Sequence, residues 1–268
     1  MQVTVYNLEG KETKKINLPD QFGEEIRPEI VKRAVLSILA NSRQPYGAKP
    51  TAGKRYSAKI SRRRRNYKGS YGYGISRSPR KILSRRGTRF YWVGAFAPNT
   101  VGGRRSHPPK SDKIWSLGLN KKERRLAIRS ALAAVVTKEI VAARGHIVPN
   151  NYPFVVVNDF ESINKTKDVS SILSKLGFDG EMARGKITKV RAGKGKARGR
   201  KHITKKSLLI VVSGTCTLLK SARNIPGVDV VDVHVLNANH LAPGTHLGRI
   251  TLFTDKAIEE MNNKKLFM

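Results

Sequence analysis

Most of the chemically active side chains in this sequence are lysines and arginines, and they gather in two acid-free runs. Residues 30–111 form a stretch of 82 residues with 21 Lys or Arg and no Asp or Glu. Residues 184–206 contain 11 Lys or Arg, and no acid occurs between Met182 and Val228. Because like charges repel, such runs need a polyanion to become compact, and nucleic acid is the natural one.

The net charge of the whole chain supports this interpretation and separates it from membrane binding. The formal charge is +34 over 268 residues. Neither an amphipathic basic helix nor a lipidation signal is present, and the N-terminus does not resemble a signal peptide. The most apolar stretch, residues 130–143, is interrupted by Lys138 and Glu139. We therefore expect a soluble, intracellular protein without a transmembrane helix.

We expect the cations of both runs to contact RNA phosphates. In the first run the predicted RNA-binding residues are Arg43, Lys49, Lys54, Arg55, Lys59, Arg62, Arg63, Arg64, Arg65, Lys68, Arg77, Arg80, Lys81, Arg85, Arg86, Arg89, Arg104, Arg105, His107 and Lys110. In the second run they are Arg191, Lys194, Lys196, Arg198, Arg200 and Lys201. The four consecutive arginines could also be a solvated patch or a targeting signal, but their acid-free surroundings favour phosphate neutralisation.

Aromatic residues are interleaved with these cations, and such residues can stack on unpaired bases for about 1–3 kcal/mol per base. For Phe90, Tyr91, Trp92 and Phe96, packing against one another is an equally good interpretation. Tyr71 and Tyr73 are flanked by glycines, and we expect them to be exposed to RNA or solvent.

Other chemistries find less support in the sequence. The stretch Gly193-Lys-Gly-Lys-Ala-Arg-Gly199 has the wrong spacing for a dinucleotide site and is followed by Arg-Lys-His instead of an apolar helix. The six histidines and the single Cys216 do not make up a zinc site, so we expect no metal and no cofactor. Ser213 and Cys216 follow an apolar strand, where α/β enzymes bind ligands, but no nucleophile elbow is present.

The apolar pattern outside the first run predicts an α/β body. We expect an N-terminal hairpin with its turn at Glu9–Lys11, a helix over residues 28–40, and one continuous helix from an Asn120 cap to Ala143. Asn120 and Glu123 have the spacing of a capping box, and the two helices should pack together. The C-terminal half predicts strands over residues 154–157, 208–212, 228–235 and 250–253, a helix over about 169–176, and a last helix capped by Thr254 or Asp255.

Buried strands that alternate with helices predict a three-layer body with a mostly parallel sheet. We assign residues 1–42 and 111–268 to this body, including the basic segment 184–206. Residues 43–110, which we call the insert, are expected to be a long extended loop, because ordinary loops rarely exceed about 12–15 residues. An out-and-back path of about 34 residues per arm reaches at most ~110 Å. A disordered insert is the alternative, and is favoured for the isolated protein.

Three stretches together resemble the universal large-subunit ribosomal protein four family, in its archaeal–eukaryotic form. They are Gly102-Gly-Arg-Arg-Ser-His-Pro-Pro-Lys110 running into residues 119–134, Arg191-Ala-Gly-Lys-Gly-Lys-Ala-Arg-Gly-Arg-Lys201, and Leu236-Asn-Ala-Asn-His-Leu-Ala-Pro-Gly-Thr-His-Leu-Gly-Arg249. The resemblance covers nearly the whole chain. The absence of a long basic C-terminal tail is typical of archaeal members.

The resemblance implies a structural, non-enzymatic component of the large ribosomal subunit in the cytoplasm. It implies a loop that threads through ribosomal RNA to the wall of the peptide exit tunnel, with its tip around residues 69–89. Tyr71, Tyr73, Arg77 and Arg80 are the tip candidates. The family often has a Gly-Ser/Thr-Gly-Arg pattern there, whereas this chain has Gly69-Ser-Tyr-Gly-Tyr-Gly74.

The expected partners are large-subunit ribosomal RNA, neighbouring ribosomal proteins and the nascent polypeptide. Two alternatives remain from the residues alone. One is a free nucleic-acid-binding or chromatin-like protein. The other is an RNA-modifying enzyme with a cofactor pocket near Ser213 and Gly214.

Overall fold

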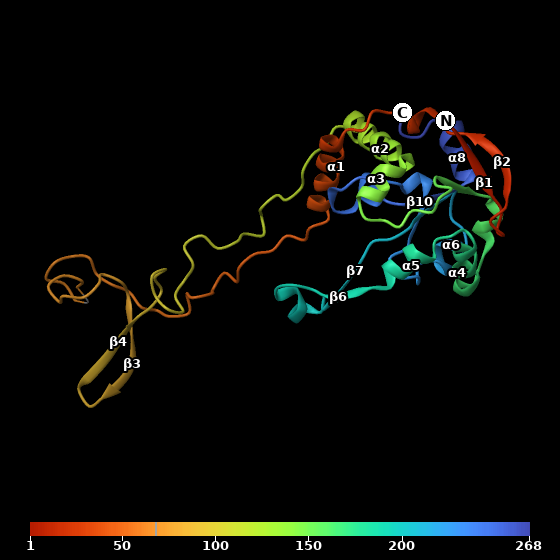
Figure 1. Cartoon of the computed structure of the whole chain (residues 1–268). Coiled ribbons are helices and arrows are strands. Elements are labelled where there is room, and N and C mark those ends of the chain that lie inside the picture. The colour runs from red at the N-terminus through yellow and green to blue at the C-terminus, as the bar shows by residue number, and fades with distance from the viewer. Residues whose placement is uncertain (68) are drawn as a thin grey trace. The chain divides into compact units, whose positions relative to one another are not determined.

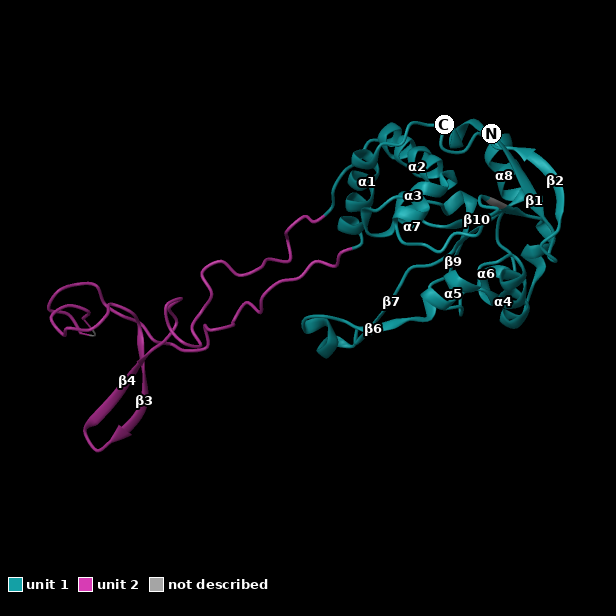
Figure 2. Ribbon diagram, viewed as in Figure 1, with its two compact units in different colours: residues 1–42, 116–268 teal, residues 43–115 magenta. Residues whose placement is uncertain are grey.

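The computed structural model describes residues 1–67 and 69–268, without the side chain of Phe154. It divides into two compact units (Figures 1 and 2): a first unit of residues 1–42 and 116–268, and a second unit of residues 43–115. Lys68, one of the predicted RNA-binding residues, lies outside the described residues. Among the described helices, none is long and apolar enough to cross a bilayer.

A six-stranded sheet forms the centre of the first unit, in the order β2-β1-β5-β10-β8-β9. Its strands are β1 (Gln2–Tyr6), β2 (Glu12–Asn17), β5 (Phe154–Val156), β8 (Leu209–Val212), β9 (Asp229–Asp232) and β10 (Thr251–Thr254). Only the β1–β2 pair is antiparallel, and it is the expected N-terminal hairpin. The other four pairings are parallel, so the predicted mostly parallel α/β sheet is confirmed.

Alternate residues of the strands are buried in two separate cores, because successive side chains point to opposite faces of a sheet. Val155, Val211 and Phe253 join the core that contains α1 (Pro28–Asn41), α2 (Lys121–Val136), α7 (Ala238–Leu241) and α8 (Asp255–Asn263). Val156 and Ile210 join the other core, with α3 (Lys138–Ala143), α4 (Thr166–Lys175), α5 (Asp179–Lys186) and α6 (Leu218–Ser221). Short 3-10 turns occur at Asp20–Phe22, Asn158–Ser162, Lys194–Arg198, Val233–Val235 and Pro243–Thr245.

The expected packing of the first two long helices is confirmed (Figure 1). Pro28 is at the first turn of α1, where its missing N–H costs nothing. Val31, Ala34 and Val35 of α1 are buried in the same core as the Ala127–Val136 part of α2. The backbone N–H of Arg27 donates to Ser130 Oγ at 2.7 Å, so the start of α1 is also tied to α2 by a hydrogen bond.

The single helix predicted from Asn120 to Ala143 is wrong, because the chain leaves the helical conformation at Thr137. Thr137 has ψ of 107°, which ends α2 at Val136 and starts α3 at Lys138. Tyr152 Oη donates to Val135 O at 2.5 Å and takes the acceptor that a continuing helix would have used. The predicted stop at Gly145 is confirmed, with φ of +89°.

Two other sequence predictions also need correction. Asn120 occupies the N-cap of α2 but makes no side-chain capping hydrogen bond. Glu123 pairs with Arg33 at 2.9 Å instead of closing a capping box. The strand predicted over residues 228–235 ends at Asp232, whose carboxylate accepts from the His234 N–H at 2.9 Å and starts a 3-10 turn. The last helix begins as expected, with Thr254 as its cap.

The second unit contains a two-stranded antiparallel hairpin that the pattern analysis did not anticipate. Its strands are β3 (Arg80–Arg86) and β4 (Arg89–Gly94), joined through Gly87, which has φ of +57°. Another two-stranded hairpin, β6 (Thr188–Val190) with β7 (His202–Thr204), belongs to the first unit.

We predict that Leu132→Ala destabilises the first unit by about 2–5 kcal/mol, because a fully buried leucine in α2 leaves a cavity. The measurement is chemical denaturation followed by far-UV circular dichroism. Leu39→Ala, at a leucine of α1 that is 43% exposed, is the control and should change stability far less. Equal losses for the two variants would contradict the assignment of the core.

Candidate nucleic-acid interface

The predicted RNA-binding cations lie at the surface. All of those described are exposed except Arg80, Lys81, Arg104 and Arg191, which are half-buried. Every ion pair in the described part of the chain lies in the first unit, and none involves Arg191–Lys201. The charge of these side chains is therefore left uncompensated within the described chain and available to a polyanion.

The β3–β4 hairpin brings several predicted cations together. Arg86 is directly opposite Arg89, and Arg85 is opposite Phe90. Like charges in opposed positions of an antiparallel pair are destabilising. The end of this hairpin is consequently a place where a bound anion would relieve repulsion.

Aromatic rings, which can stabilise cations through their negative faces, support the cations in the second unit. Lys81 Nζ lies 3.5 Å from the centroid of the Tyr56 ring. The Arg77 guanidinium lies 5.4 Å from the Tyr71 ring, and its Nη1 donates to Tyr71 Oη at 3.5 Å. The hydrogen bond and charge of Lys81 lower the pKa of Tyr56.

The aromatics of the hairpin are exposed and also touch one another. Trp92 is 56% exposed and Tyr91 47%. Phe90 and Trp92 have ring centroids 6.1 Å apart at 45°. Phe96 is half-buried and has φ of +57°. Mutual packing therefore accounts for part of this group, while the open faces of Tyr91 and Trp92 remain free to stack on bases.

The tip candidates differ in solvent exposure and in the hydrogen bonds that they make. Tyr73 is 68% exposed and Tyr71 43%, as expected for residues beside Gly72 and Gly74. Arg77 is exposed. Arg80 is half-buried, and its Nη1 donates to the carbonyl oxygens of Ser76 and Ser78 at 2.5 and 3.2 Å. Part of the Arg80 guanidinium is thus already used to hold its own loop.

A cluster around Trp115, which sequence reasoning missed, connects the two ends of the second unit. Tyr46 stacks on Trp115 at 5.6 Å and 21°. Arg43 and Lys113 lie 3.9 and 4.3 Å from the centroid of the same ring. The cluster holds its cations by cation–π contact where carboxylates are scarce.

Glycines permit close backbone approach farther along the same two arms. A Cβ on Gly53 would lie 2.4 Å from the carbonyl group of Gly103. A Cβ on Gly103 would lie 2.0 Å from Ala97 O. Any larger residue at Gly53 or Gly103 would force these segments apart, so Gly103, directly before Arg104, has a packing reason as well as a place in the motif.

The second basic run forms a compact loop on the first unit, which we call the basic hairpin (residues 188–204). Arg191 Nε donates to Arg200 O at 3.0 Å, and the Arg191 N–H donates to Lys201 O at 2.8 Å. Gly193 and Gly199 both have positive φ, near +76°. The exposed cations of this loop are Lys194, Lys196, Arg198, Arg200 and Lys201. Their positive charges therefore belong to one short turn.

A buried carboxylate fixes the start of the basic hairpin. Glu181 is fully buried and accepts from Arg184 Nη2 at 2.6 Å, Ser207 Oγ at 2.9 Å and the Ile147 N–H at 3.0 Å. Its Oε1 also lies 2.8 Å from His146 Nδ1. Burial alone would raise the pKa of Glu181, but these hydrogen bonds outweigh it and lower the pKa to about 2.

A buried arginine, Arg249, fixes the other end of the basic hairpin. Arg249 is 1% exposed, and its Nε donates to Ser207 O at 2.8 Å. Its Nη2 pairs with Asp229 at 2.6 Å, and Lys206 Nζ pairs with the same carboxylate at 2.8 Å. Residues 206–208 are therefore held from two sides, which places both ends of the basic hairpin on the body.

The carboxyl ends of the parallel strands, where α/β proteins usually bind ligands, are filled by another carboxylate. Glu161 accepts from the Ser213 N–H at 2.8 Å, Ser213 Oγ at 2.7 Å and Thr254 Oγ1 at 2.6 Å. Both hydrogen-bond donors of Ser213 pair with Glu161 and not with a described histidine. Burial raises the pKa of the Cys216 thiol. Within the described residues, no group of three His, Cys, Asp or Glu side chains could hold a metal ion.

Comparison with known proteins supports the interpretation that the geometry favours. The model of a family described as the ribosomal protein L4/L1 family matches residues 16–264. This chain belongs to that family.

Its archaeal relatives in the ribosomal protein L4/L1 family are similar over their whole length. The large ribosomal subunit protein uL4 of Nanoarchaeum equitans is 48% identical over 268 residues and covers 100% of both chains. The protein of the same name from Archaeoglobus fulgidus is 44% identical over 97% of each chain. That of Methanocaldococcus jannaschii is 43% identical over 98% of this chain and 99% of its own.

For this L4/L1-family protein, sequence reasoning found the exposed cations but missed the buried charges that position them. Glu161, Glu181 and Arg249 were not singled out for this role. The available signal was local: Arg249 lies two residues before the buried strand β10, where a charged residue has to find partners or stay at the surface. The carboxylate that pairs with Arg249 is set by the tertiary fold, because the two residues are far apart in the sequence.

We predict that Glu181 contributes acid-sensitive stability. Because its pKa falls from the ordinary 4.5 to about 2 on folding, its contribution is present above pH 4.5 and is lost as the pH drops through about 2. Glu181→Gln should lower the Tm at pH 7, and the gap to the unmodified protein should narrow between pH 5 and pH 3 in calorimetric scans. Glu139→Gln, at an exposed carboxylate, is the control. A gap that stays constant with pH would contradict this assignment.

Proposed function

We propose that this chain is a structural, non-enzymatic constituent of the large ribosomal subunit in the cytoplasm. Membership of the ribosomal protein L4/L1 family and full-length similarity to archaeal large-subunit proteins support the proposal. The observation that carries the RNA-binding part is the surface exposure of the predicted cations without any carboxylate partner in the described residues. Large-subunit ribosomal RNA supplies the missing negative charge.

The mechanism we propose is electrostatic and steric. Residues 1–42 and 111–268 form a three-layer body that docks on the subunit surface. Residues 43–110, inserted near the N-terminus, extend as the RNA-binding loop and reach the wall of the peptide exit tunnel. The exposed Tyr71, Tyr73 and Arg77, together with Arg80, are our candidates for the tunnel-facing tip.

The partners under this proposal are ribosomal RNA, neighbouring large-subunit proteins and the nascent polypeptide. Neither a membrane nor a cofactor takes part. The contacts are mainly to phosphate and to RNA shape, so base specificity is modest. The basic hairpin provides a second RNA contact from the body itself.

The experiment that tests the proposal is sucrose-gradient sedimentation of cell lysate after a high-salt wash, with detection of this chain. Salt removes polycations bound at the surface, because it screens exposed charges, but does not extract a loop enclosed by folded RNA. Sedimentation with the large subunit supports the proposal. Release to the top of the gradient would make the chain a free nucleic-acid-binding protein.

We predict that deletion of residues 62–89 leaves the body folded, because the deleted segment lies within the second unit. The Tm of the isolated deletion protein should stay close to that of the full chain. In cells, the deletion protein should still sediment with the large subunit, while chemical probing of tunnel RNA should change. Unfolding of the isolated body would show that the division into body and insert is wrong.

We also predict that the basic hairpin carries part of the salt dependence of RNA binding. Lys194→Gln, Lys196→Gln and Arg198→Gln together should flatten the plot of log K against log salt by about 0.7–0.9 per lost phosphate contact. Lys11→Gln, Lys14→Gln and Lys264→Gln together, at lysines already paired with Glu9, Asp255 and Glu260, are the matched control. The measurement is filter binding to large-subunit RNA, and an unchanged slope would exclude the basic hairpin from the interface.

A further inference from the structure

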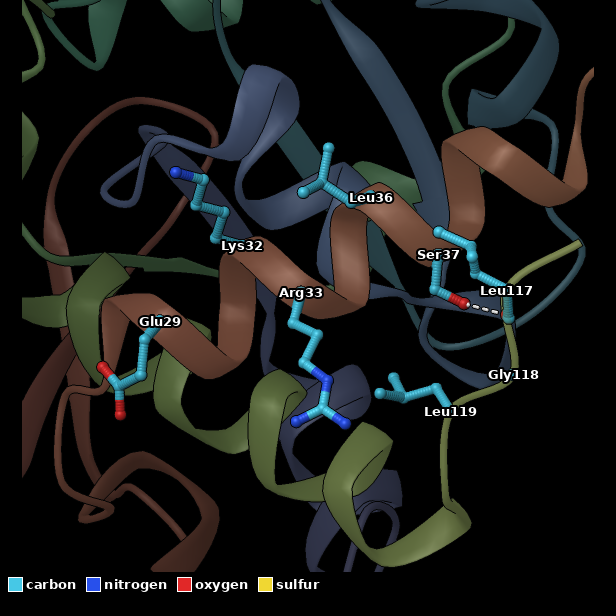
Figure 3. A pocket seen from close by; sticks show the side chains of 8 residues that line it. All are labelled: Glu29, Lys32, Arg33, Leu36, Ser37, Leu117, Gly118 and Leu119. Atoms are coloured by element: carbon cyan, nitrogen blue, oxygen red, sulfur yellow. Dashed lines mark hydrogen bonds between the residues drawn. The ribbon is translucent and has the colours of Figure 1, made fainter. Parts of the chain in front are cut away.

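An apolar groove runs along α1 in the first unit and differs in character from the RNA-binding surfaces (Figure 3). It has a volume of about 310 Å³. One side is α1, and the other is the extended segment that leads into α2. The lining residues are Glu29, Lys32, Arg33, Leu36, Ser37, Leu117, Gly118 and Leu119.

Hydrogen bonds hold the two sides of this groove in place. Ser37 Oγ donates to Leu117 O at 2.7 Å, as drawn in Figure 3. The Leu117 N–H donates to Asn41 Oδ1 at 2.9 Å, and Asn41 Nδ2 donates back to Leu117 O at 3.5 Å. The polar backbone groups of Leu117 are thus satisfied by α1, and the groove is formed before any partner arrives.

Leucine side chains remain uncovered around this fixed framework. Leu117 is 53% exposed, Leu36 45% and the adjoining Leu39 43%. Most large apolar residues of the first unit are buried in its two cores. Two exposed leucines that line one preformed groove, with a third nearby on α1, are typical of a surface that another molecule covers.

The charges beside the groove argue against RNA as the occupant. Arg33 is paired with Glu123 at 2.9 Å, and Glu29 with Arg27 at 2.9 Å. Lys32 is exposed and makes no ion pair in the described part of the chain. One unpaired cation beside leucines would bind a phosphate backbone weakly. The basic hairpin and the insert would bind it better, because they contain many cations and no acids.

We propose that this groove docks a short segment of a neighbouring large-subunit protein. The segment places an aliphatic side chain between Leu36 and Leu117 and a carboxylate beside Lys32. An aliphatic anchor buries the leucines, and the carboxylate supplies the charge that Lys32 lacks. This inference rests on the proposed ribosomal function and adds to it a protein contact separate from the RNA contacts.

The test uses the full chain in assembled large subunits. A photo-crosslinking amino acid, p-benzoylphenylalanine, replaces Leu36 in cells, and gradient-purified subunits are irradiated and digested for mass spectrometry. The expected product joins position 36 to a peptide of another large-subunit protein that carries an aliphatic residue near an Asp or Glu. The same probe at Val235, an exposed valine outside the groove, is the control and should give a different product.

Substitutions then test the chemistry of the groove. Leu117→Ser should abolish the crosslink from position 36, while the Tm of the isolated protein stays nearly constant, because Leu117 is exposed. Lys32→Glu should reduce the crosslink yield by up to about fivefold, as expected for one exposed ion pair. Lys32→Arg keeps the charge and should leave the yield unchanged.

Other outcomes overturn this inference and can be told apart from failure of the proposed function. If position 36 crosslinks to RNA, or stays uncrosslinked in subunits that contain the chain, the groove is not a protein-docking site and the ribosomal function stands. If the chain is absent from washed large subunits, the proposed function fails and this inference fails with it.

Discussion

Positive charge without a compensating carboxylate is the constraint on which the rest of this structure depends. The chain has 53 Lys or Arg against 19 Asp or Glu, and in residues 43–115 Asp112 is the single acid. The first unit pairs many of its acids with cations, and its sheet packs between two hydrophobic cores. The second unit has almost no acids to use and is organised by other interactions.

The two basic regions therefore solve the same electrostatic problem in different ways. In the second unit, aromatic rings support the cations, as Trp115 does for Arg43 and Lys113, and glycines let the two arms approach. In the basic hairpin, the cations at the turn are unpaired, but both chain ends are fixed by buried ion pairs of Glu181 and Arg249. Breaking a buried pair is costly, because it leaves an uncompensated charge in the interior. This explains how a strongly charged loop can have a defined place on the body.

The sheet also shows why an α/β architecture need not imply catalysis. In many such folds, the ends of parallel strands form a crevice for a ligand. Here the Glu161 carboxylate fills that position and uses Ser213 and Thr254 as donors. The groups that an enzyme would offer to a substrate are satisfied within the protein. Under the function that we propose, exposed cations outside the sheet contact the RNA, which agrees with membership of a ribosomal protein family.

The sequence by itself determined the charge segregation, the parallel α/β body and most of the residues expected to contact RNA. These properties follow from composition and local periodicity, which need no long-range information. Only the tertiary structure decided that the helix breaks at Thr137, where Tyr152 takes a backbone carbonyl, and that residues 80–94 pair as a hairpin. It also decided the partners of Glu181 and Arg249, because a buried charge is stabilised by groups up to 42 residues away along the chain, as Arg249 is by Ser207. Such pairings depend on which strands become neighbours, and no local pattern contains that information.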